Sequence, residues 1–273
     1  MPLMIAALLI TDSPSPNHGP RRGDAQPSLI ILHHTAMDGL ELARRRLCDP
    51  MAEVSCHYLI GRDGTALRLV PEVRRAWHAG VGAWGPITDV NSHSIGIELD
   101  HPGPLFGPDQ PPFAAPMMEA LCALLESIRR RWSIPPERVL GHSDISPGRK
   151  NDPGPRFDWA ALAAAGHAVV SDVDGPGQSG PGSPLGPEAE GAGPARARAV
   201  SALVRIGYRL PVGLDPMGAE DALLEAARLR LDPAAAPTPP GGAPAPRLRA
   251  RCADLAARFP LAPEAGHPAH ALA

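Results

Sequence analysis

The first 170 residues alternate between short apolar runs of strand character and segments with helical spacing. The run Ser28 to His34 is almost continuously apolar, as in a buried strand. Gly61-Arg-Asp-Gly64 separates two further apolar runs and predicts a β-hairpin. The predicted strands cover residues 28–34, 56–60, 65–70, 94–99 and 138–142.

Helical spacing appears between these strands. Asp38 is expected to cap a helix over residues 39–48, and Pro116 opens a long amphipathic helix that ends at Trp132. A shorter helix is expected over residues 159–165. The alternation predicts an α/β fold in which helices flank a central mixed β-sheet.

A segment rich in Gly and Pro follows, and it cannot sustain a helix or a strand ladder. Behind it lie three short stretches rich in Ala, Leu and Arg, which predict a small helical module over residues 196–206, 217–231 and 248–259. The expected division is a catalytic domain over 1–170, a linker over 171–195, the helical module over 196–262 and a tail over 263–273.

Composition narrows the class of protein. A net charge of -3 gives no basic footprint for nucleic acid, and no apolar run approaches the ~20 residues that span a bilayer. Met1 to Ile10 lacks a basic region, so we expect a mature amino terminus rather than a signal peptide. The four cysteines show no paired spacing, which favours a reducing compartment. We expect a monomer.

One cation stands apart from the others. Of 26 basic residues, Lys150 is the single lysine, and it follows Arg149. Lysine supplies a compact charge where a planar guanidinium would not fit. A compositional drift from lysine to arginine that spared one position would explain the single lysine equally well. The residues around Lys150 are needed to distinguish the two explanations.

Strand alternation places Glu98 on the face of residues 94–99 that also carries Ser94 and Gly96. A small-residue face permits close approach of a ligand. An isolated glutamate in such a position is more often a solvent-facing side chain.

Two histidines and a carboxylate suggest a metal site. His33 and His34 end one predicted strand, His142 ends another, and Asp152 follows in an Asp-Pro-Gly turn. A lone histidine at a strand end is usually a surface or core residue. Two histidines with one carboxylate, however, match a catalytic zinc set that leaves the fourth position for water, and Lys150 would add a cation for developing negative charge.

Four blocks of sequence carry a family resemblance. They are Ile31-Leu-His-His-Thr35, Arg75-Ala-Trp-His-Ala-Gly80, Ser94-Ile-Gly-Ile-Glu98 and Gly141-His-Ser-Asp-Ile-Ser-Pro-Gly-Arg-Lys-Asn-Asp-Pro-Gly-Pro155. In this order they closely resemble the zinc-dependent N-acetylmuramoyl-L-alanine amidases of the AmpD/AmiD type, within the superfamily of the peptidoglycan recognition proteins. The match runs from about residue 18 to residue 164.

The resemblance implies a role for each matching residue. It implies Zn²⁺ ligands at His33, His142 and Asp152 and catalytic roles for Glu98 and Lys150. It further implies a substrate-lining loop at Trp77, His78 and Ala79.

Two positions depart from the family pattern. Cys56 occupies a position where some phage-type relatives carry a catalytic tyrosine, and a buried apolar role for it is favoured over a fourth zinc ligand. Leu203 to Tyr208 resembles the first helix of peptidoglycan-binding domains. Leu223 to Arg228 lacks the usual aromatic residue and glutamine, so wall binding and a purely structural appendage both stay open.

The resemblance implies an enzyme that hydrolyses the amide between N-acetylmuramic or 1,6-anhydro-muramic acid and L-alanine of peptidoglycan or muropeptides. The alternative is a non-catalytic peptidoglycan-recognition protein, and a weaker one is hydrolysis of another amide. A cytoplasmic role in muropeptide recycling is expected, with the periplasm as the alternative location.

Overall fold

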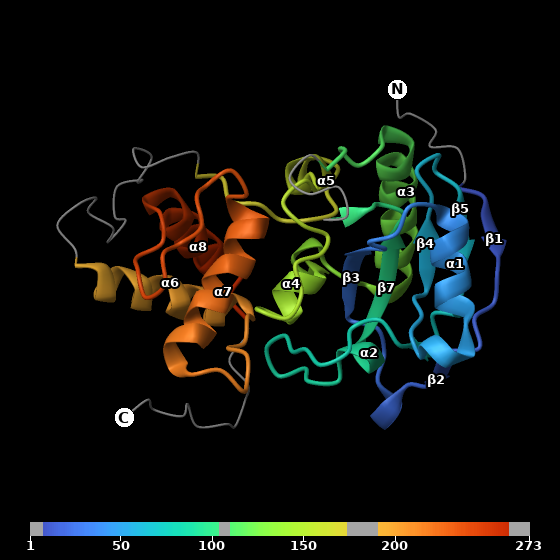
Figure 1. The fold of residues 1–273 in the computed structure, drawn as a ribbon, viewed down its shortest axis with the longest axis horizontal. Helices are drawn as coiled ribbons and strands as arrows, with labels where there is room; N and C mark the ends of the chain where they lie inside the picture. The colour runs from blue at the N-terminus through green and yellow to red at the C-terminus, as the bar shows by residue number, and fades with distance from the viewer. Residues whose placement is uncertain (1–7, 104–109, 174–190, 262–273) are drawn as a thin grey trace.

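A mixed six-stranded sheet forms the centre of the amino-terminal part of the computed structural model, which describes residues 8–103, 110–173 and 191–261 (Figure 1). In spatial order its strands are β1 (Ile10–Asp12), β5 (Ala66–Arg68), β4 (Tyr58–Ile60), β7 (Ser94–Leu99), β3 (Leu29–His34) and β8 (Val139–Gly141). β4 and β5 pair antiparallel as the predicted hairpin, and the other neighbours run parallel. A separate antiparallel ribbon joins β2 (His18–Pro20) to β6 (Arg74–Ala76).

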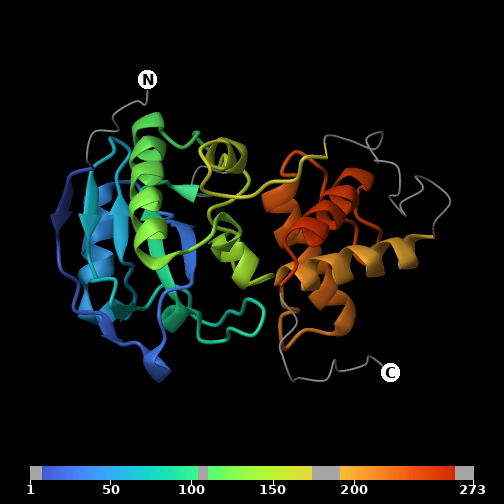
Figure 2. The same ribbon diagram turned by 180° about the vertical axis from the view of Figure 1, so that it is seen from behind.

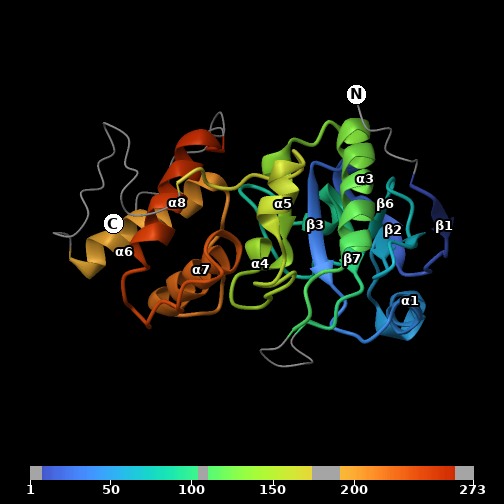
Figure 3. The ribbon, with the colours of Figure 1, turned by 90° about the horizontal axis from the view of Figure 1, so that it is seen from above.

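Helices cover both faces of the sheet (Figure 3). The long helix α3 (Ala115–Trp132) buries its apolar side against one face, where α5 (Trp159–Ala164) joins the same core. α1 (Leu40–Cys48) covers β4 and β5 on the other face. The α/β fold with a mixed sheet between helices is therefore confirmed.

Alternation along β3 decides which side chains reach each face. Ile30 and Leu32 belong to the core under α3, whereas Leu29 and Ile31 belong to the core on the opposite side. His33 follows this second set. The β3–β7 register pairs it directly with Glu98.

The carboxy-terminal helices lie beside the β8 edge of the sheet, as the rear view also shows (Figure 2). They are α6 (Ala192–Ile206), α7 (Pro216–Leu231) and α8 (Pro246–Arg258). Leu203 and Leu223 share one buried cluster with Ile31 and Leu140 of the sheet. The helical module is thus packed onto the sheet through a continuous apolar core.

Most predicted elements are confirmed within a few residues, but two details were wrong. Asp38 does not cap α1: the N-cap is Gly39, without a side-chain bond, and Asp38 pairs with Arg62 at 2.9 Å. His142 does not end a strand but begins the four-residue helix α4 (His142–Ile145), because Asp144 accepts a bond from the Gly141 N–H and closes a turn there.

Short elements were not predicted, since three or four residues show no period. Besides β1, β2, β6 and α4 they are α2 (Val90–His93) and the 3₁₀ turns Arg22–Asp24, Pro50–Ala52 and Pro136–Arg138. Residues 1–7, 174–190 and 262–273 lie outside the described residues. They contain most of the expected amino-terminal segment, most of the expected linker and the whole of the expected tail. α6 begins at Ala192, four residues before the predicted helix. Within the described ranges, no helix combines the length and apolar character needed to cross a membrane.

Candidate metal centre and substrate cavity

A cavity of about 1050 Å³ opens at the carboxyl ends of β3 and β7. Its lining includes the ends of β3 and β7, α1, the segments around Ser55 and Trp77, the loop after α4, and α7. The residues that line it include His34, Arg46, Ser55, Trp77, His78, Glu98, Gly148, Arg149, Lys150, Ala222, Glu225, Ala226 and Leu229, together with the three side chains described next. Ligands of α/β sheets bind at this edge, because the loops that vary between proteins gather there.

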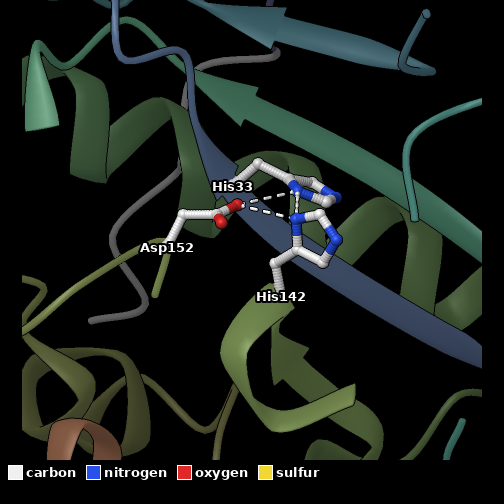
Figure 4. A group of neighbouring side chains, drawn as sticks. All are labelled: His33, His142 and Asp152. Atoms are coloured by element: carbon white, nitrogen blue, oxygen red, sulfur yellow. Dashed lines mark hydrogen bonds and ion pairs between the residues drawn. The ribbon is translucent and has the colours of Figure 1, made fainter. Parts of the chain in front are cut away.

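Three side chains converge at the floor of this cavity (Figure 4). His33 Nδ1, His142 Nδ1 and Asp152 Oδ2 lie 3.0 Å from one another, and all three residues are buried. They form a group that could hold a metal ion. The sequence places them 109 and 10 residues apart, and the fold brings them together.

The tautomer of His142 follows from the hydrogen bond that its Nε2 makes, on the side of the ring away from the centre. Nε2 lies 3.0 Å from the carbonyl oxygen of Ala79, which can only accept, so Nε2 carries the hydrogen. Arg149 Nη2 lies 3.3 Å from the same nitrogen but donates to the same Ala79 carbonyl at 2.6 Å. Nδ1 of His142 therefore offers a lone pair to the centre.

A longer chain of hydrogen bonds fixes His33. Ser94 Oγ donates to the Val90 carbonyl at 2.6 Å, so this hydroxyl accepts the hydrogen of His78 Nε2 at 3.1 Å. His78 Nδ1 then accepts from His33 Nε2 at 3.0 Å. His33 Nδ1 is left without a hydrogen. Burial lowers the pKa of His33 to about 4, which keeps this imidazole neutral.

Three acceptor atoms thus meet with no hydrogen between them. Two neutral imidazole nitrogens and a carboxylate oxygen repel one another unless a cation lies in their midst. Ligand atoms of a tetrahedral site with bonds of about 2.0–2.2 Å lie about 3.3–3.6 Å apart, slightly wider than the separations found here. The donor set and its spacing fit a small divalent ion.

Glu98 lies on the cavity wall beside this group. Its side chain is partly buried, and Oε2 has no hydrogen-bond partner. Burial and the charge of Asp152 raise the pKa of Glu98 to about 8, against the opposing effect of Lys150. A carboxylate with an unsatisfied oxygen and a raised pKa is suited to accept and return a proton.

Lys150 and Arg149 have different tasks in the structure. The Arg149 guanidinium is bound to loop 79–81: it donates to the carbonyls of Ala79 and Val81 and to Ser146 Oγ. Lys150 and Arg149 are both exposed and both line the cavity, so what separates them is the binding of the Arg149 guanidinium to backbone carbonyls. The neighbours therefore favour a functional Lys150 over compositional drift.

The three residues of the predicted substrate loop, Trp77, His78 and Ala79, have different roles. Trp77 is partly exposed on the cavity wall. His78 also lines the cavity but is bound to His33, and Ala79 has a fully buried side chain whose carbonyl orients His142. Ala79 was predicted to line the substrate groove, but its buried side chain cannot do so, and its role is carried by the backbone carbonyl that orients His142.

The small-residue face of β7 accommodates a protein side chain, which corrects the interpretation of Gly96. A Cβ on Gly96 would lie 2.4 Å from the His78 ring. The glycine thus admits the imidazole that supports His33. His34 faces away from the centre, toward His101, as expected.

Cys56 is fully buried in the apolar cluster under α1, and burial raises the pKa of its thiol well above the ordinary value. It is not part of the metal group found among the described residues. This environment supports the apolar interpretation.

Sequence reasoning missed a buried network that joins α4 to the helical module. Asp144 has no exposed surface and accepts from Tyr208 Oη at 2.6 Å and from Arg230 Nη1 at 2.8 Å. The Arg230 guanidinium also lies 3.9 Å from the ring centre of Trp159. The available signal was the position of Asp144 two residues after His142, but its partners lie 64 and 86 residues away.

Comparison with known proteins agrees with this geometry. A family model described as N-acetylmuramoyl-L-alanine amidase (Amidase_2) matches residues 23–155. The 1,6-anhydro-N-acetylmuramyl-L-alanine amidase AmpD of Enterobacter cloacae is 34% identical over 168 residues, which cover 55% of this chain and 87% of that protein. N-acetylmuramoyl-L-alanine amidase AmiD of Escherichia coli is 38% identical over 159 residues, 53% of this chain and 55% of that protein.

Two solved structures extend the similarity to the carboxy-terminal helices. E. coli AmiD, solved with the substrate anhydro-N-acetylmuramic acid-L-Ala-D-γ-Glu-L-Lys, superposes with a TM-score of 0.71 at 29% identity, over 88% of this chain and 92% of that one. AmpDH3 of Pseudomonas aeruginosa gives 0.68 at 27% identity, over 87% and 94%. Because the family, its named relatives and the fold agree, the chain belongs to the Amidase_2 family and is an N-acetylmuramoyl-L-alanine amidase, an enzyme rather than a non-catalytic recognition protein.

Proposed function

We propose that the enzyme is zinc-dependent and cleaves the amide between the muramic acid lactyl group and L-alanine in muropeptides, including 1,6-anhydro-muropeptides. The observation that carries this proposal is the convergence of three acceptor atoms, from His33, His142 and Asp152, beside Glu98 in one cavity. Two histidines and a carboxylate form a set of three protein ligands that zinc hydrolases use. The anhydro sugar is proposed because AmpD is named for it.

Each residue of the chain has a distinct part in the proposed reaction. A zinc ion held by the three ligands would act as a Lewis acid and lower the pKa of water at its open position to about 7. Glu98 takes a proton from the attacking water and returns it to the amine of the departing L-alanine. The Lys150 ammonium faces the negative charge that develops on the carbonyl oxygen.

Positioning falls to the surrounding residues. His78 and the Ala79 carbonyl hold the two imidazoles with their lone pairs toward the centre. Trp77 offers an aromatic surface on the cavity wall against which a sugar ring could pack.

The domain division is also part of the proposal: a catalytic domain to residue 170, a linker, and a helical module that begins with α6. We propose a monomer in the cytoplasm, with the periplasm as the alternative. All four cysteines are free, which suits a reducing compartment.

Digestion of purified anhydro-muropeptide, followed by mass spectrometry, tests this function. Release of free stem peptide should stop with a chelator and return when zinc is added. The Glu98→Gln variant should bind zinc but release no peptide above background. Zinc-loaded protein that binds the muropeptide without releasing peptide would contradict the proposal.

A further inference from the structure

One side of α7 forms a wall of the substrate cavity. Its cavity residues are spaced as one stripe of a helix: Ala222, Glu225, Ala226 and Leu229. Leu223 and Ala227 face the core that the module shares with the sheet. α7 therefore carries Ala and Leu both on the side that packs into the core and on the side that lines the cavity, and Ala226 belongs to both.

This wall adjoins the loop that carries the proposed catalytic lysine. A Cβ on Gly148 would lie 3.0 Å from the Ala222 side chain, so helix and loop are in contact there. The small side chain of Ala222 lets the helix approach this loop closely. Glu225 is longer and is the polar residue of the cavity stripe.

Glu225 is held in place at the cavity edge. Both of its oxygens accept from Arg228, at 2.7 Å each. Arg228 is in turn fixed by the carbonyls of Pro233 and Ala235. The Glu225 side chain remains 43% exposed, so its free lone pairs are open to a ligand.

The opposite end of the cavity has a different character. Arg46 of α1, a helix on the other side of β3 and β7 from α7 (Figure 1), lines it there, and Trp77 is hydrogen-bonded to Ser55, which also lines the cavity. A sugar ring, which is uncharged and has apolar faces, suits the aromatic end. The α7 wall offers two alanines, a leucine and one carboxylate, which suit a peptide that carries a positive charge.

We propose that α7 is the peptide-side wall of the cavity and that Glu225 selects muramoyl peptides with a side-chain ammonium group. This inference rests on the proposed amidase site and adds a substrate class to it. The substrate bound to AmiD carries such a group on its terminal L-Lys. The helical module thereby takes part in substrate choice.

Three synthetic substrates test the selection: anhydro-muramoyl-L-Ala-D-γ-Glu followed by L-Lys, by Nε-acetyl-L-Lys or by L-Ala. The wild-type kcat/KM should be about fivefold higher for free lysine than for acetyl-lysine, the size expected of a partly exposed ion pair. This preference should decline as salt is added. In Glu225→Gln the preference should vanish.

Glu220→Gln is the matched control. Glu220 lies on the same helix and pairs with Arg196 at 2.6 Å, but it does not line the cavity. This variant should keep the fivefold preference. Equal rates on lysine and acetyl-lysine in the wild type, or an unchanged preference in Glu225→Gln, would overturn the selection while leaving the amidase intact. Failure of the zinc-loaded wild type on all three substrates would instead refute the proposed function.

Discussion

Glu98 and His33 are direct register partners across the parallel β3–β7 pair. Their side chains leave the sheet on the same face, so hydrogen bonding between strands places the proposed proton acceptor beside the first proposed metal ligand. A shift of one residue in this register would turn one of the two side chains to the α3 face. The placement of Glu98 relative to His33 is therefore set by the sheet rather than by a loop.

Replacement of Glu98 by glutamine should abolish proton transfer while keeping the shape of the site. We expect kcat to fall about 10²–10⁴-fold, the usual contribution of a positioned acid or base. Zinc affinity, measured by competition with a coloured chelator, should stay within a few-fold of the wild type, because Glu98 is not one of the three ligands. A large loss of zinc with an unchanged kcat in the zinc-loaded fraction would assign Glu98 to the metal instead.

The same substitution should change how stability depends on pH in the metal-free protein. The pKa of Glu98 is raised from its ordinary value of 4.5 to about 8, chiefly by burial. The folded protein therefore holds this proton more tightly than the unfolded chain. The resulting stabilisation is complete below pH 4.5 and is lost as pH rises through about 8.

Urea unfolding across this range provides the measurement. Relative to Glu98→Gln, the metal-free wild type should lose free energy of unfolding as pH increases. The other titrating groups are common to both proteins and cancel in the difference. Parallel curves for the two proteins would show that Glu98 is not desolvated.

Lys150→Arg should damage catalysis although it conserves the charge. The guanidinium is wider than an ammonium, and the adjacent Arg149, which also lines the cavity, shows that an arginine in this loop binds backbone carbonyls. We expect kcat to fall at least about tenfold, and Lys150→Ala to approach the 10²–10³-fold loss typical of a missing oxyanion donor. Arg149→Lys is the reciprocal control and should mainly lower the melting temperature. Full activity in Lys150→Arg would remove the lysine from the mechanism.

His78→Leu should weaken metal binding without removing a ligand. His78 accepts the Nε2 hydrogen of His33 and thereby keeps Nδ1 of that residue free of a proton. Loss of such a partner typically lowers metal affinity about 10–100-fold. His93→Leu changes a histidine whose side chain binds the Asp89 carbonyl and which does not line the cavity, so zinc affinity should stay unchanged. Equal zinc affinities in the two variants would contradict the supporting role.

The sequence predicted the long elements and the residues of the centre, because an apolar period and a specific motif are both local. It did not predict how the centre is supported. The Gly96 face admits His78, and Asp144 is held by Tyr208 and Arg230, both from far along the chain. Nor could it show that α7 would reach the cavity, since its Ala-rich stripe has the composition of any packed helix.

Arg230→Met should test whether the helical module supports the metal centre. Arg230 and Asp144 are both buried, so removing the arginine leaves a buried carboxylate with two weaker donors, Tyr208 and the Gly141 N–H. Breaking such a pair costs about 3–5 kcal/mol of stability. Because Asp144 closes the turn of α4 that carries His142, we also expect zinc affinity to fall about 10–100-fold, as for other supporting partners.

Arg196→Met separates this effect from general loosening of the module. Arg196 is equally buried and pairs with Glu220 and Asp221 at 2.6 and 2.7 Å, yet it has no contact with α4 among its hydrogen bonds and ion pairs in the described residues. Both variants should unfold at lower temperature, but only Arg230→Met should bind zinc more weakly. It should also alter the visible absorption of the cobalt-substituted enzyme, which reports on ligand geometry. If the two variants lose stability alike and both keep wild-type zinc affinity and cobalt spectra, the Asp144 network holds the fold together without positioning His142.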